Sequence, residues 1–443
     1  MDLIATMLPS FGNAAFTLIA FVVALSVIVA IHEYGHYIVG RWSGIHADVF
    51  SIGFGKVLWS RTDKRGTVWQ IALLPFGGYV KFKGDGNAAS VGADETVQRS
   101  RDTMLGAPLW ARSATVAAGP VFNFILSMFV FAGLLLFQGM PMSPLTVASM
   151  PDLPEQFQGE LQAGDTILRI EGQAFSYPDG FDEVADTIPS QPFVTYDIER
   201  DGQRMSVTGP QPRSTLVQSI TPRSAADDAN LSAGDVVLSM DGEAVYRFSD
   251  MIDIVNAKGG GPISLEIWRD GSVRTEVLTP RMVAMPQEDG GMKDEPKLGL
   301  GGGLVFEPAT SGVGLFEALW LGMQQVWFII VQSLNGLGHM ISGAISSCNL
   351  SGPVGIAETS GSMASQGLMS FISFIAVLST AVGLLNLFPI PILDGGHLVF
   401  HAYEAVTGKM PSDGALRVLM ALGLSLIGTM MLFAIANDLF LCP

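Results

Sequence analysis

The chain has 443 residues, of which 49% are hydrophobic and only 15% charged, and its formal net charge is −17. Apolar content this high is unusual for a soluble protein of this length and predicts several membrane spans. The strong negative charge argues against nucleic acid as a partner, because binding to a polyanion requires clustered lysine and arginine.

Four stretches are long and apolar enough to cross a bilayer as helices, since about 20 apolar residues span its hydrocarbon core. They are Ala14 to Val39, Ser113 to Phe137, Leu368 to Pro389 and Val418 to Ala436. The first is not expected to be a cleaved signal peptide, because Asp2 and no basic residue precedes it. The sequence therefore predicts a polytopic α-helical membrane protein with four transmembrane helices.

The first predicted span ends in the motif His32-Glu33-Tyr34-Gly35-His36. Histidines four residues apart share one face of a helix, so both imidazoles can bind one Zn²⁺ while Glu33 activates a bound water. Polar groups at membrane depth are costly unless they serve a function. The motif therefore predicts zinc-dependent hydrolysis inside the bilayer.

Two apolar segments flank a charged turn in the loop after the first span. Lys56-Val-Leu-Trp-Ser60 precedes the turn Arg61-Thr-Asp-Lys-Arg-Gly66, and Thr67-Val-Trp-Gln-Ile-Ala-Leu73 follows it. This pattern predicts a β-hairpin. Because a lone two-stranded unit is marginally stable, we expect it to pack on the helices or enter the membrane interface. It either presents a strand edge to an unwound substrate or packs as a surface hairpin on its own protein.

Lysine and arginine predict the orientation of the chain. Residues 41 to 112 carry 10 basic and 6 acidic residues, whereas residues 139 to 300 carry 12 basic and 26 acidic residues. Cytoplasmic loops are enriched in basic residues, so the first loop is predicted to be cytoplasmic and both termini to lie outside. The long acidic region is then extracytoplasmic.

An internal repeat occupies this acidic region. Leu161-Gln-Ala-Gly-Asp165-Thr-Ile-Leu168-Arg-Ile-Glu-Gly172 recurs as Leu231-Ser-Ala-Gly-Asp235-Val-Val-Leu238-Ser-Met-Asp-Gly242, and Asp197-Ile-Glu-Arg-Asp-Gly202 matches Glu266-Ile-Trp-Arg-Asp-Gly271. The spacing predicts two copies of one domain of about 70 residues. In each copy a Gly-Asp turn leads into an alternating strand, then a helical stretch and a hairpin closed by Asp-Gly.

The repeat resembles tandem PDZ domains of the bacterial, protease-associated kind, which have an α+β fold. We place the first copy at residues 139–210 and the second at 211–284, with a linker at 285–315. Such domains accept an extended peptide or a carboxyl terminus as an added strand. The alternative, which we weigh equally, is that the two copies act as a spacer or a size-excluding cap.

The region from residue 316 to residue 443 is predicted to hold an amphipathic helix and the last two spans. Phe316 to Ile345 contains a series of polar side chains and fits an interfacial or partly embedded helix: Gln324, Gln325, Gln332, Asn335 and His339. A fifth span at this place would reverse the next helix and separate Asp394 from the two motif histidines.

A helix break follows the third predicted span, in Asn386-Leu-Phe-Pro389-Ile-Pro391-Ile-Leu-Asp394-Gly-Gly-His397. Two prolines and a glycine pair unwind the backbone here, which the membrane tolerates only where it lines a cavity. A catalytic zinc needs a third protein ligand. The metzincin extension is absent, because Val39 and Trp42 stand three and six residues beyond the motif. Asp394 is therefore the best candidate for the third ligand.

The two cysteines, Cys348 and Cys442, lack the spacing of a metal site and are not expected to bind metal. Both fall on the outer side in this topology, where either a disulfide or two free thiols is compatible with the sequence.

Four features together resemble the bacterial site-2 protease family of the RseP type. They are the histidine motif at the end of the first span, Ala118-Gly-Pro-Val-Phe-Asn123 in the second, the tandem PDZ copies, and Asn386-x-x-Pro-x-Pro-x-Leu-Asp394-Gly. The resemblance covers nearly the whole chain, and the two catalytic motifs together are far more specific than either alone.

The resemblance implies an intramembrane zinc metalloprotease. It implies Zn²⁺ bound by His32, His36 and Asp394, Glu33 as general base, and a substrate strand held by Asn386 and the segment of Pro389 and Pro391. It also implies that Gly53-Phe-Gly-Lys56 and the following hairpin form a membrane-associated β element near the site.

The substrates that the family implies are single-pass membrane proteins of the anti-sigma-factor type, with remnant signal peptides as a second class. The family implies the bacterial inner membrane as the location. The PDZ domains would lie on the periplasmic side and the active site near the cytoplasmic side.

Two other functions explain only part of the sequence. A membrane-anchored PDZ scaffold leaves the buried His32, Glu33, His36 and Asp394 without a purpose. A zinc or solute transporter leaves both the PDZ copies and Glu33 unexplained.

Overall fold

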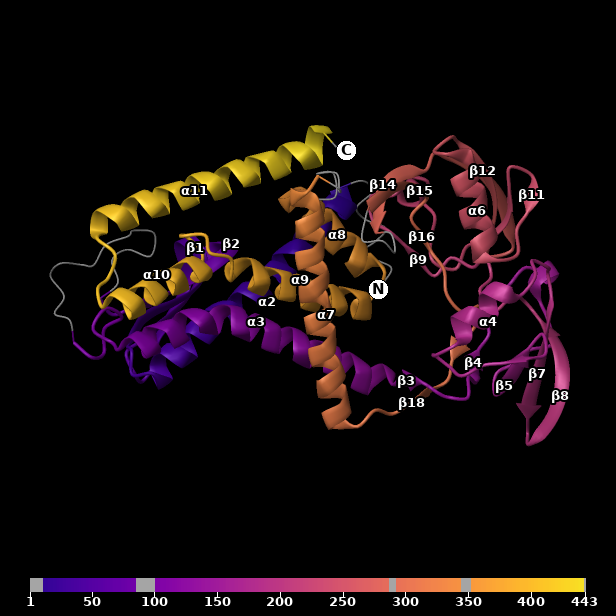
Figure 1. The fold of residues 1–443 in the computed structure, drawn as a ribbon, viewed down its shortest axis with the longest axis horizontal. Coiled ribbons are helices and arrows are strands. Elements are labelled where there is room, and N and C mark those ends of the chain that lie inside the picture. The colour runs from indigo at the N-terminus through magenta and orange to yellow at the C-terminus, as the bar shows by residue number, and fades with distance from the viewer. Residues whose placement is uncertain (1–10, 85–99, 287–291, 344–351, 442–443) are drawn as a thin grey trace. The chain divides into compact units, whose positions relative to one another are not determined.

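The computed structural model describes residues 11–84, 100–286, 292–343 and 352–441 (Figure 1). Cys348 and Cys442 lie outside the described residues. The chain forms two compact units: one holds Met1–Leu134, Leu315–Gly338 and Ser347–Pro443, and the other holds Leu135–Gly314 and His339–Ser346.

The first unit is built from helices and one small sheet. Its helices are α2 (Phe11–Trp42), α3 (Leu109–Gln138), α7 (Leu315–Ile341), α8 (Pro353–Ser365), α9 (Leu368–Asn386), α10 (Asp394–Thr407) and α11 (Asp413–Ala436), the last continued by the π-helical Asn437–Leu441. Five of them, α2, α3, α7, α9 and α11, are long and apolar enough to cross a membrane. The four predicted spans are among these five, and α7 is the additional candidate.

Small residues let α2, α3 and α9 approach closely. A Cβ atom on Gly35 of α2 would lie 2.5 Å from the carbonyl oxygen of Ala118 in α3. A Cβ atom on Gly383 of α9 would lie 3.1 Å from the Cβ of Asn123 in α3, and the Ser379 hydroxyl donates to the Asn123 carbonyl at 3.0 Å. Close contact between small residues and interhelical hydrogen bonds are what hold helices together in lipid.

Helix α10 is attached to α3 by buried polar contacts. The Arg112 guanidinium donates two hydrogen bonds to the Glu404 carboxylate, at 3.0 and 2.7 Å, and the two side chains are only 7% and 19% exposed. Ser113 and His401 approach to 3.2 Å beside this pair. A paired, two-pronged contact of this kind fixes orientation as well as distance.

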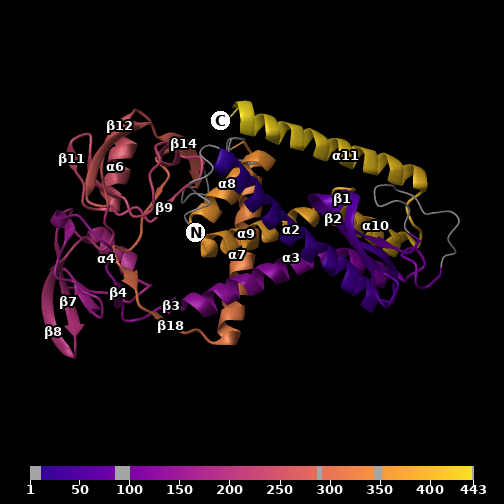
Figure 2. The same ribbon diagram turned by 180° about the vertical axis from the view of Figure 1, so that it is seen from behind.

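Helix α7 runs across α3 in both views of the fold (Figures 1 and 2). At the crossing, a Cβ atom on Gly322 would lie 2.5 Å from the carbonyl oxygen of Met128. Val326 of α7 is buried against the same helices, whereas Trp320 and Trp327 are 56% and 66% exposed. Exposed tryptophans of this kind are typical of helices that meet a membrane interface.

The predicted β-hairpin is confirmed and is longer than expected. Strands β1 (Ala47–Thr62) and β2 (Val68–Phe82) both bend, so that Ser51 pairs with Tyr79 as well as with Gln70. The bend in β1 uses Gly53 and Gly55, with φ of +89° and +84°, a region that favours glycine.

The hairpin is tied to the helix that carries the histidine motif. The Asp63 carboxylate accepts hydrogen bonds from Tyr37 of α2 and from Trp69 of β2, each at 3.3 Å, and Arg41 of α2 lies 3.6 Å away. The opposite part of the sheet exposes large apolar side chains, namely Phe54, Val57, Leu58, Trp59, Ile71, Leu73 and Leu74. This exposed surface fits the predicted contact with the membrane interface.

The second unit contains the two predicted copies. The first has β5 (Thr166–Ile170), β6 (Gln173–Ala174), α4 (Phe181–Thr187), β7 (Val194–Arg200) and β8 (Gln203–Gly209), preceded by a 3₁₀ turn at Glu155–Phe157. The second has α5 (Ala225–Asp228), β10 (Val236–Met240), β11 (Glu243–Ala244), α6 (Phe248–Lys258), β12 (Ile263–Arg269) and β13 (Ser272–Leu278). Their sheets have equivalent strand orders, β6-β5-β7-β8 and β11-β10-β12-β13, as a sequence repeat requires.

The repeated Gly-Asp turn has the same structural role in both copies. Asp165 and Asp235 are fully or almost fully buried, and each pairs at 2.6 Å with an arginine on the neighbouring strand, Arg200 and Arg269 respectively. The hydrogen bond to Asp165 raises the pKa of the Arg200 guanidinium, and Asp235 does the same to Arg269. The matching pairs explain why the aspartate recurs at the same place in the repeat.

The prediction of a linker at residues 285–315 is wrong. Strands β14 (Arg281–Pro286) and β15 (Met292–Lys297) form a hairpin, and β16 (Leu300–Gly301) pairs with β9 (Ser219–Ile220) of the second copy. Further along, β17 (Glu307–Pro308) pairs with β4 (Val147–Ser149) and β18 (Thr310–Ser311) with β3 (Met140–Pro141), both of the first copy. One continuous segment thus completes both folds.

The core residues lead to the same conclusion. Leu298 is buried in the core of the second copy, and Val305 and Phe306 are buried in the core of the first. Close packing explains a glycine in this segment, because a Cβ atom on Gly302 would lie 2.4 Å from the Phe248 ring.

Candidate metal centre

Three side chains from distant parts of the chain converge in the helical unit. The Nε2 atoms of His32 and His36 lie 3.1 and 3.5 Å from Oδ2 of Asp394, and 3.1 Å from each other. Their side chains are 11%, 13% and 17% exposed. Among the described residues, this is the one cluster of three such side chains close enough to hold a metal ion, with all ligand atoms within 4.8 Å of one another.

The helix break places Asp394 at this cluster. Asp394 is the first residue of α10, and the segment before it folds back over the first turn of that helix. Cβ atoms on Gly395 and Gly396 would lie 2.3 Å from the carbonyl oxygen of Leu387 and 2.2 Å from that of Ile390. Only glycines fit under this segment, which explains why the pair follows the aspartate.

The residues present fit a zinc ion. A Cβ atom on Gly119 of α3 would lie 2.4 Å from Nε2 of His36 and 2.7 Å from Nε2 of His32. Because residue 119 is glycine, α3 places no side chain where the ligand atoms meet. Oδ2 of Asp394 is buried and has no hydrogen-bond donor among the described residues. Two imidazole nitrogens and one carboxylate oxygen are a ligand set of catalytic zinc, with a fourth position left for water.

A backbone carbonyl orients one of the histidines. Nδ1 of His36 lies 2.8 Å from the carbonyl oxygen of Thr115 in α3. A carbonyl only accepts, so Nδ1 carries the proton and Nε2 keeps the lone pair that a metal needs. Thr115 was not predicted, since a carbonyl contact has no residue signature. Gly119 was predicted only as part of the second-span motif, because a glycine in an apolar helix has several explanations.

Strand β2 passes beside Glu33. The backbone of Val80 hydrogen-bonds to the Glu33 carboxylate, and a Cβ atom on Gly78 would lie 3.1 Å from Cγ of Glu33. The predicted hairpin therefore reaches the motif glutamate. This position favours a strand edge presented to substrate over a hairpin that only packs on the surface of its own protein.

The three predicted substrate-binding residues lie in or next to the helix break. Asn386 is the last residue of α9, and no hydrogen bond of its side-chain amide is found among the described residues. Pro389 is exposed, and Pro391 packs on α11, where a Cβ atom on Gly423 would lie 3.2 Å from it.

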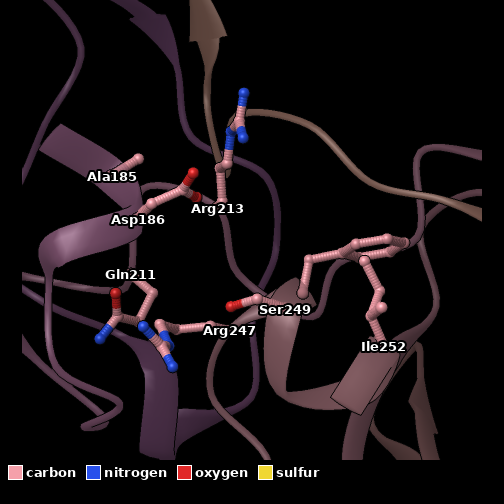
Figure 3. Close-up of a pocket in the computed structure, with 8 residues that line it drawn as sticks. Ala185, Asp186, Gln211, Arg213, Arg247, Ser249 and Ile252 are labelled. Atoms are coloured by element: carbon pink, nitrogen blue, oxygen red, sulfur yellow. The ribbon is translucent and has the colours of Figure 1, made fainter. Parts of the chain in front are cut away.

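A separate pocket lies within the second unit, between the two repeat copies (Figure 3). It is lined by Ala185, Asp186, Gln211, Arg213, Arg247, Phe248, Ser249 and Ile252. Its volume of about 130 Å³ is that of a few water molecules and is too small for a peptide.

Residues 20–430 of the chain match the family described as "Peptidase family M50". A "Putative zinc metalloprotease" of Agrobacterium fabrum is 32% identical and covers 98% of this chain and 98% of its own length. The "Regulator of sigma-E protease RseP" of Escherichia coli is 31% identical, over 95% of this chain and 98% of its own.

A solved structure, the PDZ domain of an SdrC-like protein from Listeria monocytogenes, is 20% identical over 20% of this chain and 87% of its own, with a TM-score of 0.17. The repeated motif and the two equivalent sheets identify the two copies as one kind of domain. The family match over most of the chain, together with the buried two-histidine, one-aspartate cluster, leads to one conclusion: the chain belongs to peptidase family M50 and is a zinc metalloprotease of the site-2 type.

Proposed function

We propose that this metalloprotease cleaves peptide bonds within the transmembrane segments of single-pass membrane proteins, with His32, His36 and Asp394 as its zinc ligands. The convergence of both Nε2 atoms on Oδ2 of Asp394, inside the helical unit, is the observation that carries the proposal. Glu33 follows the first ligand on α2 and is the general base.

Bound zinc would lower the pKa of a coordinated water from about 15.7 to about 7 and polarise the scissile carbonyl. The Glu33 carboxylate takes the proton of the attacking water, and the carbonyl carbon gains a bond to the water oxygen. Glu33 then passes the proton to the leaving amine nitrogen as the C–N bond breaks.

The substrate segment must be unwound before it is cut, because a helix hides its carbonyls in internal hydrogen bonds. Strand β2 beside Glu33 supplies backbone groups that can pair with an extended segment. The uncommitted amide of Asn386 and the exposed Pro389 supply a second wall. We therefore propose that the unwound strand lies between β2 and the helix break.

Four helices are proposed to span the membrane, with α7 in the outer interface. The crossing of α7 over α3 and its exposed Trp320 and Trp327 support this topology. The metal cluster supports it as well. If α7 spanned the membrane, α9 would run in the opposite direction and Asp394 would lie at the wrong end of α2. With the basic first loop inside, the active site faces the cytoplasmic side of the inner membrane and the PDZ copies face the periplasm.

The substrates are proposed to be anti-sigma-factor-type proteins that a first protease has already trimmed outside, with remnant signal peptides as a second class. The name of the Escherichia coli relative, a regulator of a sigma factor, supports the first class. The PDZ copies are proposed to reject untrimmed ectodomains by size, either with or without binding an extended peptide or carboxyl terminus.

Replacing the base and the third ligand should have different effects on zinc. We expect Glu33→Gln to keep zinc and to lose cleavage of a tagged single-pass substrate by about 10²–10⁴-fold, the usual contribution of a general base. Asp394→Ala should lose zinc as well as cleavage. Bound zinc and product would be measured on purified protein in detergent; equal zinc in all three proteins would remove Asp394 from the ligand set.

A methyl group on Gly119 should displace the metal. Gly119→Ala is expected to weaken zinc binding about 5- to 150-fold, since overpacking costs about 1–3 kcal/mol. Gly133→Ala is the matched control, because it lies on the same helix and a Cβ atom there meets nothing within 4 Å. Chelator competition measures both affinities, and unchanged affinity of Gly119→Ala would place the metal elsewhere.

The topology predicts that both ends of α7 lie on one side of the membrane. Single cysteines at Gly312 and Ser342, in a background with Cys348→Ser and Cys442→Ser, should react from outside with a membrane-impermeant maleimide. Labelling of one site from outside and of the other only after the membrane is permeabilised would instead make α7 a fifth span.

Removal of the PDZ copies should allow an untrimmed substrate to be cut. Residues 143–308 must leave together, because the segment after the second copy completes the first; Met142 already bonds to Ala309 at 2.8 Å and can be joined to it by a short turn. Cleavage of the full-length substrate by the deletion variant would be scored against its cleavage by the intact enzyme. Continued rejection by an active deletion variant would assign the size limit to another part of the protein.

A further inference from the structure

We propose that the side chain of Asn123 is a positioning residue for the metal centre, which accepts a hydrogen bond from Nδ1–H of His32 and so directs Nε2 of that ring to the metal. The inference rests on the ligand set proposed above. Asn123 was singled out in the sequence only as part of a motif, without a role.

Helix α3 contacts the Nδ1 atom of both histidines. Nδ1 of His36 meets the Thr115 carbonyl at 2.8 Å, and Nδ1 of His32 lies 3.2 Å from the side-chain amide of Asn123. Thr115 and Asn123 are eight residues apart on α3, about two turns, so both fall on the face that meets α2. Each ring is therefore held from behind by α3 while its Nε2 faces Asp394.

The orientation of the Asn123 amide decides which nitrogen of His32 carries the proton. Nδ2 of Asn123 faces the ring, while its Oδ1 is buried without a hydrogen-bond partner among the described residues. If Nδ2 donated to Nδ1, the ring proton would sit on Nε2, and that nitrogen would have no lone pair for a metal. Yet Nε2 of His32 is the atom that lies 3.1 Å from Oδ2 of Asp394.

A half-turn of the amide resolves this conflict. Oxygen and nitrogen of the amide have nearly the same size, so their exchange needs no change in packing. Oδ1 then accepts from Nδ1–H, and Nε2 of His32 keeps its lone pair. Acceptors behind metal-binding histidines commonly fix the ring and its tautomer in this way.

The backbone of Asn123 is held firmly enough for this task. Its carbonyl accepts hydrogen bonds from the hydroxyls of Ser127 and Ser379, each at 3.0 Å, and the residue is completely buried. Ser379 belongs to α9, so the same residue links the helix before the break to α3. The amide is thereby fixed at one distance from the ring.

Three variants of the full chain test the proposal through zinc affinity, measured by chelator competition on purified protein. Asn123→Leu removes the acceptor and is expected to weaken zinc binding 10- to 100-fold, the usual effect of losing a partner of a ligand histidine. Asn123→Asp keeps an acceptor oxygen at the same place and should retain wild-type affinity or exceed it. Gly133→Ala, which lies on the same helix and whose added Cβ meets nothing within 4 Å, should leave the affinity unchanged.

Wild-type affinity in Asn123→Leu would overturn the proposal. So would affinity in Asn123→Asp as low as in Asn123→Leu, because the amide would then act as a donor. The unfolding temperature of the zinc-free proteins shows whether Asn123→Leu also loosens the fold; if it does, Asn123→Asp decides. His36→Ala is the reference: if it binds zinc as well as wild type, the ligand set itself is wrong, whatever Asn123 does.

Discussion

The close approach of α3 to α2 is the constraint on which the metal centre depends. Two histidines and a carboxylate can be buried in a bundle of apolar helices only if each polar atom has a partner. Gly35 and Gly119 remove the side chains that would keep the two helices apart. The gap that they leave is filled by imidazole rings on one side and by acceptors of α3 on the other.

Other elements gather around this pair of helices. The sheet reaches Glu33 through Gly78 and Val80, and α10 is held against α3 by Arg112 and Glu404. Replacing a buried ion pair with apolar residues is often neutral for stability, so such a pair is better explained by the orientation it fixes. Here that orientation belongs to the helix whose first residue is Asp394.

Much of this arrangement can be predicted from sequence, because several constraints act on few residues. Helical spacing joins His32 to His36, and two prolines with two glycines mark the break that carries Asp394. Bilayer topology then brings these segments to one depth. The roles of Gly119 and Thr115 could not be predicted, since they depend on which face of α3 meets α2, and hydrophobic periodicity is weak in a helix that is apolar all round. The strands within 285–315 could not be predicted either, since glycines allow both loose chain and very close packing, and only the packed neighbours distinguish the two.

The strand segment from Leu298 to Ser311 has a consequence for the order in which the protein is made. During synthesis, the first PDZ copy leaves the ribosome before the second, yet its own last strands come after the second copy is complete. The second copy can close once Gly301 has emerged, whereas the first must wait for a further ten residues, through Ser311. The usual order of domain folding along a chain is therefore inverted. Until that point the first copy has an uncovered core, because Val305 and Phe306 have not yet joined it.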